Sequence, residues 1–118
     1  MKYRFFEYSA CSSCRKARKA LESKGIDFEA IPIVDRPPSA KDLAAYVKKS
    51  GLPLKKFLNT SGVLYREMKI SEKWAGMSEA EAIELLAKHG KLIKRPLLVG
   101  GERVLVGFDE KAYANLKS

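Results

Sequence analysis

The hydrophobic positions near the start of the chain follow a strand pattern, then a helix pattern, then a strand pattern again. Residues 3 to 7 form an apolar run that predicts a first strand. The next segment has apolar residues at helical spacing to about Lys24, and Gly25 is the expected end of this helix. Residues 28 to 34 predict a second strand, which should lie parallel to the first because a crossover helix joins them. The apolar face of the helix consists of Cys14, Ala17 and Leu21.

The middle of the chain, about residues 39 to 90, has a mostly helical pattern. Two helices are predicted to begin at Ser39 and Ser78, because each serine opens a capping-box sequence. They are expected to end before Gly51 and Gly90. Between them lie a short helical turn, a polar turn and a segment without a clear pattern, at residues 53–58, 59–62 and 65–74.

After this helical stretch the pattern returns to strands. Residues 97 to 99 and 103 to 106 predict a hairpin, and Asp109 is the expected cap of a last helix. A β-α-β unit that carries a C-x-x-C motif, a helical insertion, a hairpin and a final helix predict a thioredoxin-like (glutaredoxin-like) α/β fold. We therefore expect one domain over residues 1–118, with a four-stranded mixed sheet and a helical insertion at about 39–90.

In a thioredoxin-like fold, a cis-proline begins the strand that faces the active cysteine. Pro96, in the dipeptide Arg95-Pro96, stands at the matching place and is expected to be this proline. Most X-Pro bonds are trans, so the expectation comes from the fold and not from the dipeptide itself.

The composition is that of a soluble globular protein. Of 118 residues, 46% are hydrophobic and 31% are charged, and no apolar run approaches the roughly 20 residues needed to cross a bilayer. The first residues lead into a strand and lack a signal-peptide core, which predicts a cytoplasmic protein. A permanent structural disulfide is not expected in that reducing compartment.

The chain is strongly basic, with a net charge of +9 from 23 Lys and Arg against 14 Asp and Glu. The basic residues alternate with carboxylates, and aromatic residues do not interleave with them as they do on RNA-binding sheets. We therefore interpret the charge as solubilising, expect no direct contact with nucleic acid or membrane, and expect a monomer.

The only cysteines of the chain, Cys11 and Cys14, are separated by two residues at the start of the first predicted helix. This spacing places both thiols on one face of the first helical turn, close enough to form a disulfide. The unpaired N–H groups of a helix N-terminus favour a thiolate at Cys11, and Arg15 and Arg95 are further positive groups. Cys11 is thus the predicted attacking thiol, and Cys14, on the apolar face, is the predicted resolving thiol.

The two cysteines have two other interpretations. Cysteine is often buried as a small hydrophobic residue, and a cytoplasmic C-x-x-C motif can be half of a zinc site. Zinc needs four ligands, and the only other soft donor in the chain is His89, at a predicted helix end. We therefore predict no metal site within one chain, and a site shared between two copies stays open.

Four segments together closely resemble the glutaredoxin-dependent arsenate reductase (ArsC/Spx) family over nearly the whole chain. They are Cys11-x-x-Cys14-Arg15-Lys16-Ala17, Gly25-Ile26, Asn59-Thr60-Ser61-Gly62 and Leu92-Ile93-Lys94-Arg95-Pro96. The family includes arsenate reductases, Spx-type transcriptional regulators that bind the RNA polymerase alpha subunit, and small reductase-like proteins. The resemblance implies a thiol-based reaction without a bound cofactor, with glutathione, glutaredoxin or thioredoxin as electron donor.

In the arsenate reductases, the residue at the place of Cys11 attacks arsenate and three arginines hold the oxyanion. Arg95 matches one arginine, whereas the others fall near Asn59 and Gly107. Each missing charge-assisted hydrogen bond is worth about 1.5–3 kcal/mol, so efficient arsenate reduction is not expected. The resemblance implies a catalytic set of Cys11, Cys14 and Arg95, with Asn59 and Pro96 in substrate binding.

The Spx-type regulators carry both the C-x-x-C pair and the Arg-Pro motif, whose arginine supports the oxidised state. Residues 52 to 62, however, resemble the reductase-like members and not the polymerase-binding region of the regulators. The first hypothesis is therefore a thiol-disulfide oxidoreductase. The alternatives are a redox-switched regulator that binds RNA polymerase and an arsenate reductase that uses glutathione and glutaredoxin.

Overall fold

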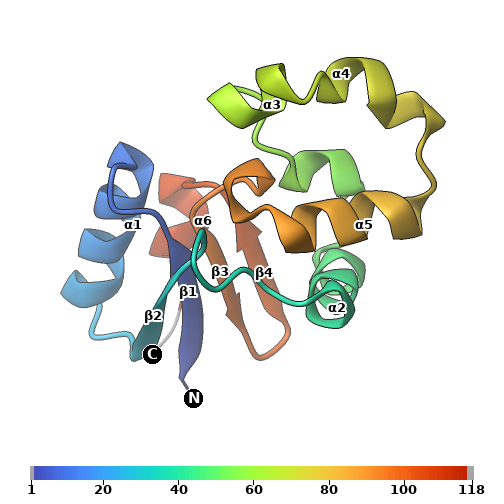
Figure 1. Ribbon diagram of the computed structural model, residues 1–118. Helices are drawn as coiled ribbons and strands as arrows, with labels where there is room; N and C mark the ends of the chain where they lie inside the picture. Colours follow the sequence, from blue (N-terminus) through green and yellow to red (C-terminus); the bar gives the residue numbers. More distant parts are fainter. Residues whose placement is uncertain (1, 117–118) are drawn as a thin grey trace.

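Four strands form one mixed sheet in the order β2-β1-β3-β4 (Figure 1). Strands β1 and β2 are parallel, whereas β3 pairs antiparallel with β1 and with β4, so the predicted four-stranded mixed sheet is confirmed. The computed structural model describes residues 2–116, and Met1, Lys117 and Ser118 of the predicted domain lie outside the described residues. The strands are β1 (Tyr3–Glu7), β2 (Phe28–Pro32), β3 (Leu97–Gly100) and β4 (Arg103–Val106).

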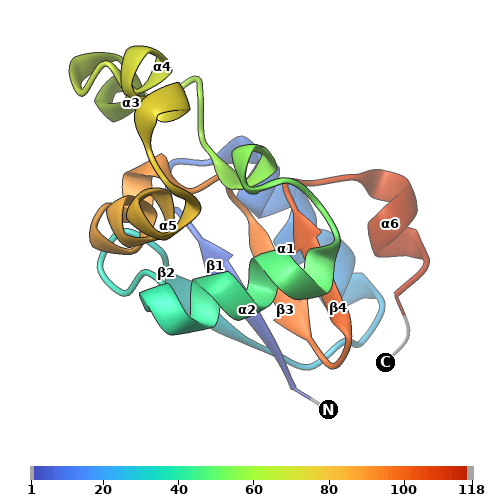
Figure 2. The same ribbon diagram turned by 90° about the vertical axis from the view of Figure 1, so that its right-hand side faces the viewer.

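Helices cover both faces of this sheet (Figures 1 and 2). Alternate residues of β1 point to opposite faces, so that Phe5 packs in the cluster with α1 and Phe6 in the cluster with α2 and α5. Both phenylalanines are buried, and each face of the sheet thus has its own hydrophobic core. The helices are α1 (Ser12–Ser23) and α6 (Glu110–Ala114) on one face, and α2 (Ala40–Ser50) and α5 (Glu79–Lys88) on the other.

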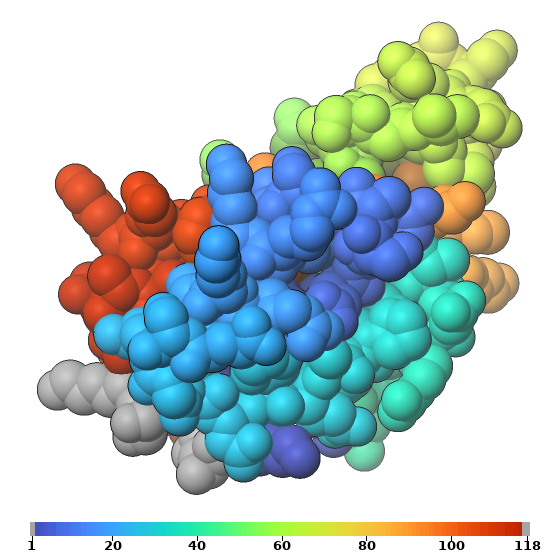
Figure 3. Space-filling model, turned by 90° about the vertical axis from the view of Figure 1, so that its left-hand side faces the viewer, coloured from blue at the N-terminus to red at the C-terminus, as the bar shows by residue number. Residues whose placement is uncertain are grey.

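The segment between β2 and β3 is helical, as predicted, and part of it stands away from the sheet as a small lobe (Figure 3). Residues 65–74, for which the sequence pattern predicts no element, lie mostly in two short helices of this lobe. Lys69 joins them in the left-handed conformation (φ 52°), and the buried Ile70 anchors the lobe to the core. The short helices of the insertion are η1 (Leu54–Phe57), α3 (Val63–Glu67), α4 (Ile70–Lys73), η2 (Trp74–Gly76) and η3 (Gly90–Leu92).

Two local features near the cysteines bear on the predictions. Strand β2 ends at Pro32, two residues earlier than predicted, because the chain then turns and the Arg36 N–H donates to the Pro32 carbonyl at 2.8 Å. The Arg95-Pro96 peptide bond is cis, as expected for this fold.

Within residues 2–116, no helix is both long and apolar enough to cross a membrane.

Candidate active site

The two cysteines lie where β1 leads into α1, and the sequence of this turn makes Cys11 the cap of the helix. Cys11 has extended backbone angles (φ −96°, ψ 116°), and its Sγ accepts a hydrogen bond from the Cys14 N–H at 3.2 Å. An N–H of the first helical turn, which has no carbonyl partner inside the helix, thus points at the Cys11 sulfur. Both thiols are free, Cys11 is partly exposed, and Cys14 is only 1% exposed. The burial of Cys14 agrees with its predicted place on the apolar face of the helix.

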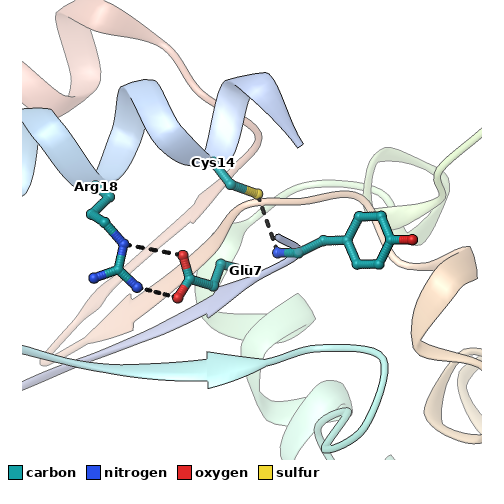
Figure 4. A network of polar contacts seen from close by, with 4 residues as sticks. Glu7, Cys14 and Arg18 are labelled. Atoms are coloured by element: carbon teal, nitrogen blue, oxygen red, sulfur yellow. Dashed lines mark hydrogen bonds and ion pairs between the residues drawn. The ribbon is translucent and has the colours of Figure 1, made fainter. Parts of the chain in front are cut away.

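Cys14 is held as a protonated thiol. Its burial, a hydrogen bond to Cys11 and the charge of Cys11 raise the pKa of the Cys14 thiol to about 12. The Tyr8 N–H donates to the Cys14 Sγ at 3.5 Å (Figure 4), and this bond and the charge of Arg95 act in the opposite direction. Desolvation is the largest of these effects, so Cys14 needs to lose its proton before or during an attack on a disulfide.

Arg95 lies on the C-terminal side of the insertion, directly before Pro96, and reaches the loop that follows β1. Its guanidinium Cζ is 4.4 Å from the centroid of the Tyr8 ring, and its Nη1 donates to the Lys91 carbonyl at 3.2 Å. Arg95 is close enough to Cys14 for its charge to lower the pKa of that thiol. The sequence prediction did not include Tyr8, although an aromatic residue between β1 and the cysteine motif is a signal that could have identified it.

Asn59 is connected to Arg95 and not directly to the cysteines. The Asn59 Nδ2 donates to the Lys91 carbonyl at 3.2 Å, so Asn59 and Arg95 bind the same oxygen. The Asn59 N–H also donates to the Leu92 carbonyl at 2.7 Å. A Cβ at Gly62 would lie 2.9 Å from Asn59 Nδ2, which explains the glycine in this turn. Asn59 thus holds the backbone of Lys91 and Leu92, and the Lys91 carbonyl in turn binds Arg95.

A backbone hydrogen bond connects Pro96 and Gly107. Pro96 is buried, and its carbonyl accepts a hydrogen bond from the Gly107 N–H at 2.8 Å. Gly107 has a φ of 76°, and a Cβ there would lie 3.0 Å from Lys94 Cε. A residue with a side chain would be strained at this position. Position 107, where the arsenate reductases have their third arginine, therefore favours glycine in this chain.

A cleft of about 580 Å³ opens beside Cys14, between α1 and the loops that follow β1 and β2. The Arg18 guanidinium forms a two-pronged ion pair with the Glu7 carboxylate there, with Nε 3.3 Å from Oε1 (Figure 4). The Arg18 side chain is therefore turned toward β1 and is only 38% exposed. Arg15, Asp35 and Lys91 line other parts of the cleft.

The described residues offer no evident metal centre. Among residues 2–116 there is no group of three or more His, Cys, Asp and Glu side chains that could hold a metal ion. His89 is the C-cap of α5, and its N–H donates to the Leu85 carbonyl at 3.2 Å.

The chain is similar to known proteins over nearly its whole length. Residues 6–116 match the ArsC family. The uncharacterized protein YusI of Bacillus subtilis is 51% identical over 113 residues, which are 96% of each chain. A crystal structure of an ArsC family related protein from Bacteroides fragilis has 50% identity and a TM-score of 0.94, covering 99% of this chain and 98% of its own. The global transcriptional regulator Spx of Streptococcus pyogenes is 28% identical over 101 residues, 86% of this chain and 74% of its own. These similarities confirm the predicted thioredoxin-like fold class.

Proposed function

Because the chain belongs to the ArsC family, we propose that it is a cytoplasmic thiol-disulfide oxidoreductase that works through Cys11 and Cys14. The observation that carries the proposal is the hydrogen bond of 3.2 Å from the Cys14 N–H to the Cys11 Sγ. It joins a partly exposed sulfur, suited to attack, to a residue whose own sulfur is buried and protonated. This asymmetry is what a reaction with one attacking and one resolving thiol requires.

The proposed reaction has two exchange steps. The Cys11 thiolate attacks one sulfur of a substrate disulfide, and the other sulfur leaves with the electron pair of the broken bond and takes up a proton. The Cys14 sulfur then attacks Cys11, releases the bound half of the substrate as a thiol and leaves a Cys11–Cys14 disulfide. Two electrons from glutathione, glutaredoxin or thioredoxin restore both thiols, so no bound cofactor is needed.

Arg95 is proposed to stabilise anionic sulfur in both steps. Its charge lowers the pKa of Cys14, and its contacts with Tyr8 and the Lys91 carbonyl hold it in place. Asn59 and Pro96 are proposed to shape the substrate site, Asn59 through the carbonyl that it shares with Arg95 and Pro96 through its place directly after Arg95 and its contact with Gly107. Arsenate is a poorer substrate in this proposal, because Asn59 and Gly107 stand where the family's arsenate reductases have arginines.

A second candidate function is favoured by the similarity to the Spx regulators. The C-x-x-C pair caps α1, so that a Cys11–Cys14 disulfide would change the start of an exposed helix. The protein would then bind a partner, such as the RNA polymerase alpha subunit, in a redox-dependent way. A pull-down with reduced and oxidised protein tests this, and redox-dependent retention of one stoichiometric partner is the result that favours the regulator.

Turnover is the measurement that tests the oxidoreductase. The reduced protein is offered a glutathione mixed disulfide and, in parallel, arsenate, with a regenerating glutathione or thioredoxin system. We expect turnover of the disulfide, none with Cys11→Ser, and a trapped substrate adduct with Cys14→Ser that mass spectrometry detects. Wild-type activity in Cys11→Ser would exclude the proposal, and a protein that forms the disulfide without turning over either compound would favour the regulator.

A further inference from the structure

We propose that Glu7 accepts the proton that Cys14 loses when its sulfur attacks the mixed disulfide on Cys11, and that Arg18 positions the Glu7 carboxylate for this role. The inference rests on the proposed thiol-disulfide function and deepens it by assigning the proton transfer of the second step. The observation behind it is that Glu7, Cys14 and Arg18 line the same cleft. Figure 4 shows Cys14 and Arg18 extending from α1 toward the end of β1 that carries Glu7.

The backbone holds Glu7 and Cys14 in a fixed relation. Glu7 is the last residue of β1, and the next N–H, that of Tyr8, donates to the Cys14 Sγ at 3.5 Å. The Ile33 N–H donates to the Glu7 carbonyl at 2.9 Å, so β2 also restrains this strand end. These bonds hold the end of β1, which carries Glu7, beside the Cys14 sulfur.

The Glu7 side chain is restrained as well. Arg18 follows Cys14 by one helical turn and lies on the same side of α1. Its Nε and Nη2 bind the two carboxylate oxygens of Glu7, a fork that orients the carboxylate plane. The Glu7 side chain remains 21% exposed, so the carboxylate has access to solvent in the cleft and can exchange a proton with it.

The second exchange step requires a proton acceptor because only a thiolate is an effective nucleophile. The pKa of Cys14 is raised to about 12, and burial is the largest cause. Once Cys11 is part of a mixed disulfide, the hydrogen bond to Cys11 and the charge of Cys11 no longer raise the pKa of Cys14, but the burial of Cys14 persists. A nearby base lowers the barrier by removing the proton as the new sulfur–sulfur bond forms.

The groups around Cys14 leave few candidates for that base. The basic side chains Arg15, Arg18, Lys91 and Arg95 are cations at neutral pH and accept no proton. Tyr113 of α6 packs in the hydrophobic cluster with α1, and its burial and the charge of Cys14 raise the pKa of its hydroxyl, which keeps it protonated. Of the residues that line the cleft, Glu7 and Asp35 are the two carboxylates, and Asp35 lies exposed in the loop after β2.

The proposed step is balanced in atoms and electrons. The Cys14 Sγ forms a bond with the Cys11 Sγ, and the bond between Cys11 and the substrate sulfur breaks. The substrate sulfur leaves with the electron pair of that bond. The Cys14 proton passes to Glu7, directly or through solvent in the cleft, and then to the leaving thiolate, so that the products are a Cys11–Cys14 disulfide and a substrate thiol.

The reaction of the reduced protein with 5,5′-dithiobis(2-nitrobenzoate) separates the two exchange steps. Attack by Cys11 releases a first nitrothiobenzoate ion, and resolution by Cys14 releases a second, which Cys14→Ser should abolish. We expect Glu7→Gln to slow the second phase at pH 7 by at least about tenfold, which is less than the roughly 100- to 10,000-fold typical of a general base, because nitrothiobenzoate is a good leaving group. The first phase should stay within about twofold.

The pH profile distinguishes a proton acceptor from a structural residue. As the pH rises toward 10, hydroxide can replace the carboxylate, so the deficit of Glu7→Gln should shrink. Arg18→Gln should slow the second phase by a smaller factor than Glu7→Gln, because the carboxylate is kept but no longer oriented. Asp35→Asn is the matched control, since it removes the other carboxylate of the cleft, and should leave both phases unchanged.

Each contrary result identifies what is wrong. A second phase that is unchanged in Glu7→Gln overturns the role of Glu7 while the oxidoreductase stands. A deficit that is equal at every pH, or a larger deficit in Asp35→Asn, also overturns it. A wild-type protein without a Cys11-dependent first phase overturns the thiol-disulfide function and, with it, this role of Glu7.

Discussion

The Arg95 guanidinium lies over the ring of Tyr8, with its Cζ 4.4 Å from the ring centroid. The same Tyr8 donates its backbone N–H to the Cys14 Sγ at 3.5 Å. One residue therefore holds both the cation and the buried thiol whose pKa that cation lowers. A cation over an aromatic ring is worth about 0.5–2 kcal/mol, depending on how far the pair is removed from water.

Replacing Tyr8 tests whether its ring positions Arg95. Tyr8→Leu keeps the backbone N–H but removes the ring, so Arg95 should lose part of its orientation. We expect kcat/KM for disulfide reduction to fall by about two- to tenfold, which corresponds to roughly 0.4–1.4 kcal/mol. Tyr8→Phe keeps the ring and is the matched control, expected near the wild-type value. Equal losses in the two variants would show that the hydroxyl, and not the ring, is what matters.

The burial of Cys14 predicts a large difference in alkylation between the two thiols. A thiol pKa of about 12 in place of 9.0 makes the thiolate about 1,000-fold scarcer at pH 8, since each pH unit is a factor of ten. Iodoacetamide at pH 8 should therefore modify Cys11 first and leave Cys14 unmodified until the protein is unfolded. The rate at Cys14 should rise as the pH approaches 12, because a raised pKa shifts thiolate formation to higher pH.

Peptide mapping by mass spectrometry after timed quenching measures both rates. Protein unfolded in urea supplies the control, in which the two cysteines should react at similar rates. Equal rates in the folded protein would contradict the assignment of Cys14 as a buried, protonated thiol.

The parts of the fold that the sequence predicts well depend on local signals. The C-x-x-C spacing and the helical period place Cys11 at the cap of α1 and Cys14 on its buried face, because both positions follow from one helical turn. The capping box at Ser78 fixes the start of α5 in the same way. The two short helices of the lobe were not predicted. Lys69, which joins them, takes a left-handed backbone conformation that is uncommon for lysine, so the sequence gives no signal for the break between them.

The unpredicted parts of the candidate site depend on contacts between distant segments. Glu7 and Arg18 come from a strand and a helix, and nothing in either segment alone shows that they pair. Asn59 was predicted from its place in a family motif, but its shared contact with Arg95 at the Lys91 carbonyl follows only from how the insertion packs on the sheet. Local periodicity contains no information on such pairs.

The close packing of Gly90 predicts a strongly destabilising substitution. A Cβ at this position would lie 2.0 Å from the Ile33 carbonyl oxygen and 2.8 Å from its carbon, both of which are backbone atoms. Gly90→Ala should therefore force the chain apart and reduce the free energy of unfolding by about 1–3 kcal/mol or more. Activity should fall as well, because Gly90 precedes Lys91, whose carbonyl binds Arg95.

Urea denaturation measures this change, and Gly76→Ala is the control. A Cβ at Gly76 meets no atom within 4 Å, so its effect should stay within about 0.5 kcal/mol. A Gly90→Ala protein as stable as the control would mean that the contact between η3 and the chain after β2 is looser than the structure has it.

The capping box of α5 predicts a pH-dependent contribution to stability. The Ser78 Oγ accepts from the Glu81 N–H at 3.2 Å, and Glu81 Oε1 accepts from the Ser78 N–H at 3.1 Å. Ser78→Ala should cost about 1 kcal/mol at pH 7, as expected for the loss of an N-cap. The hydrogen bonds from the Ser78 backbone and side chain lower the pKa of Glu81 below its usual 4.5.

A lowered pKa in the folded state stabilises the protein above the unfolded value, and this contribution is lost as the pH falls through the folded value. Glu81→Gln should therefore be less stable than the wild type at pH 7, and the difference should shrink below pH 4.5. Urea denaturation from pH 3 to 7 measures it, with Glu84→Gln, an exposed change on the same helix, as the control. A difference between Glu81→Gln and the wild type that is constant over this range would contradict the capping box as the source, because an uncoupled carboxylate contributes equally to the folded and the unfolded chain.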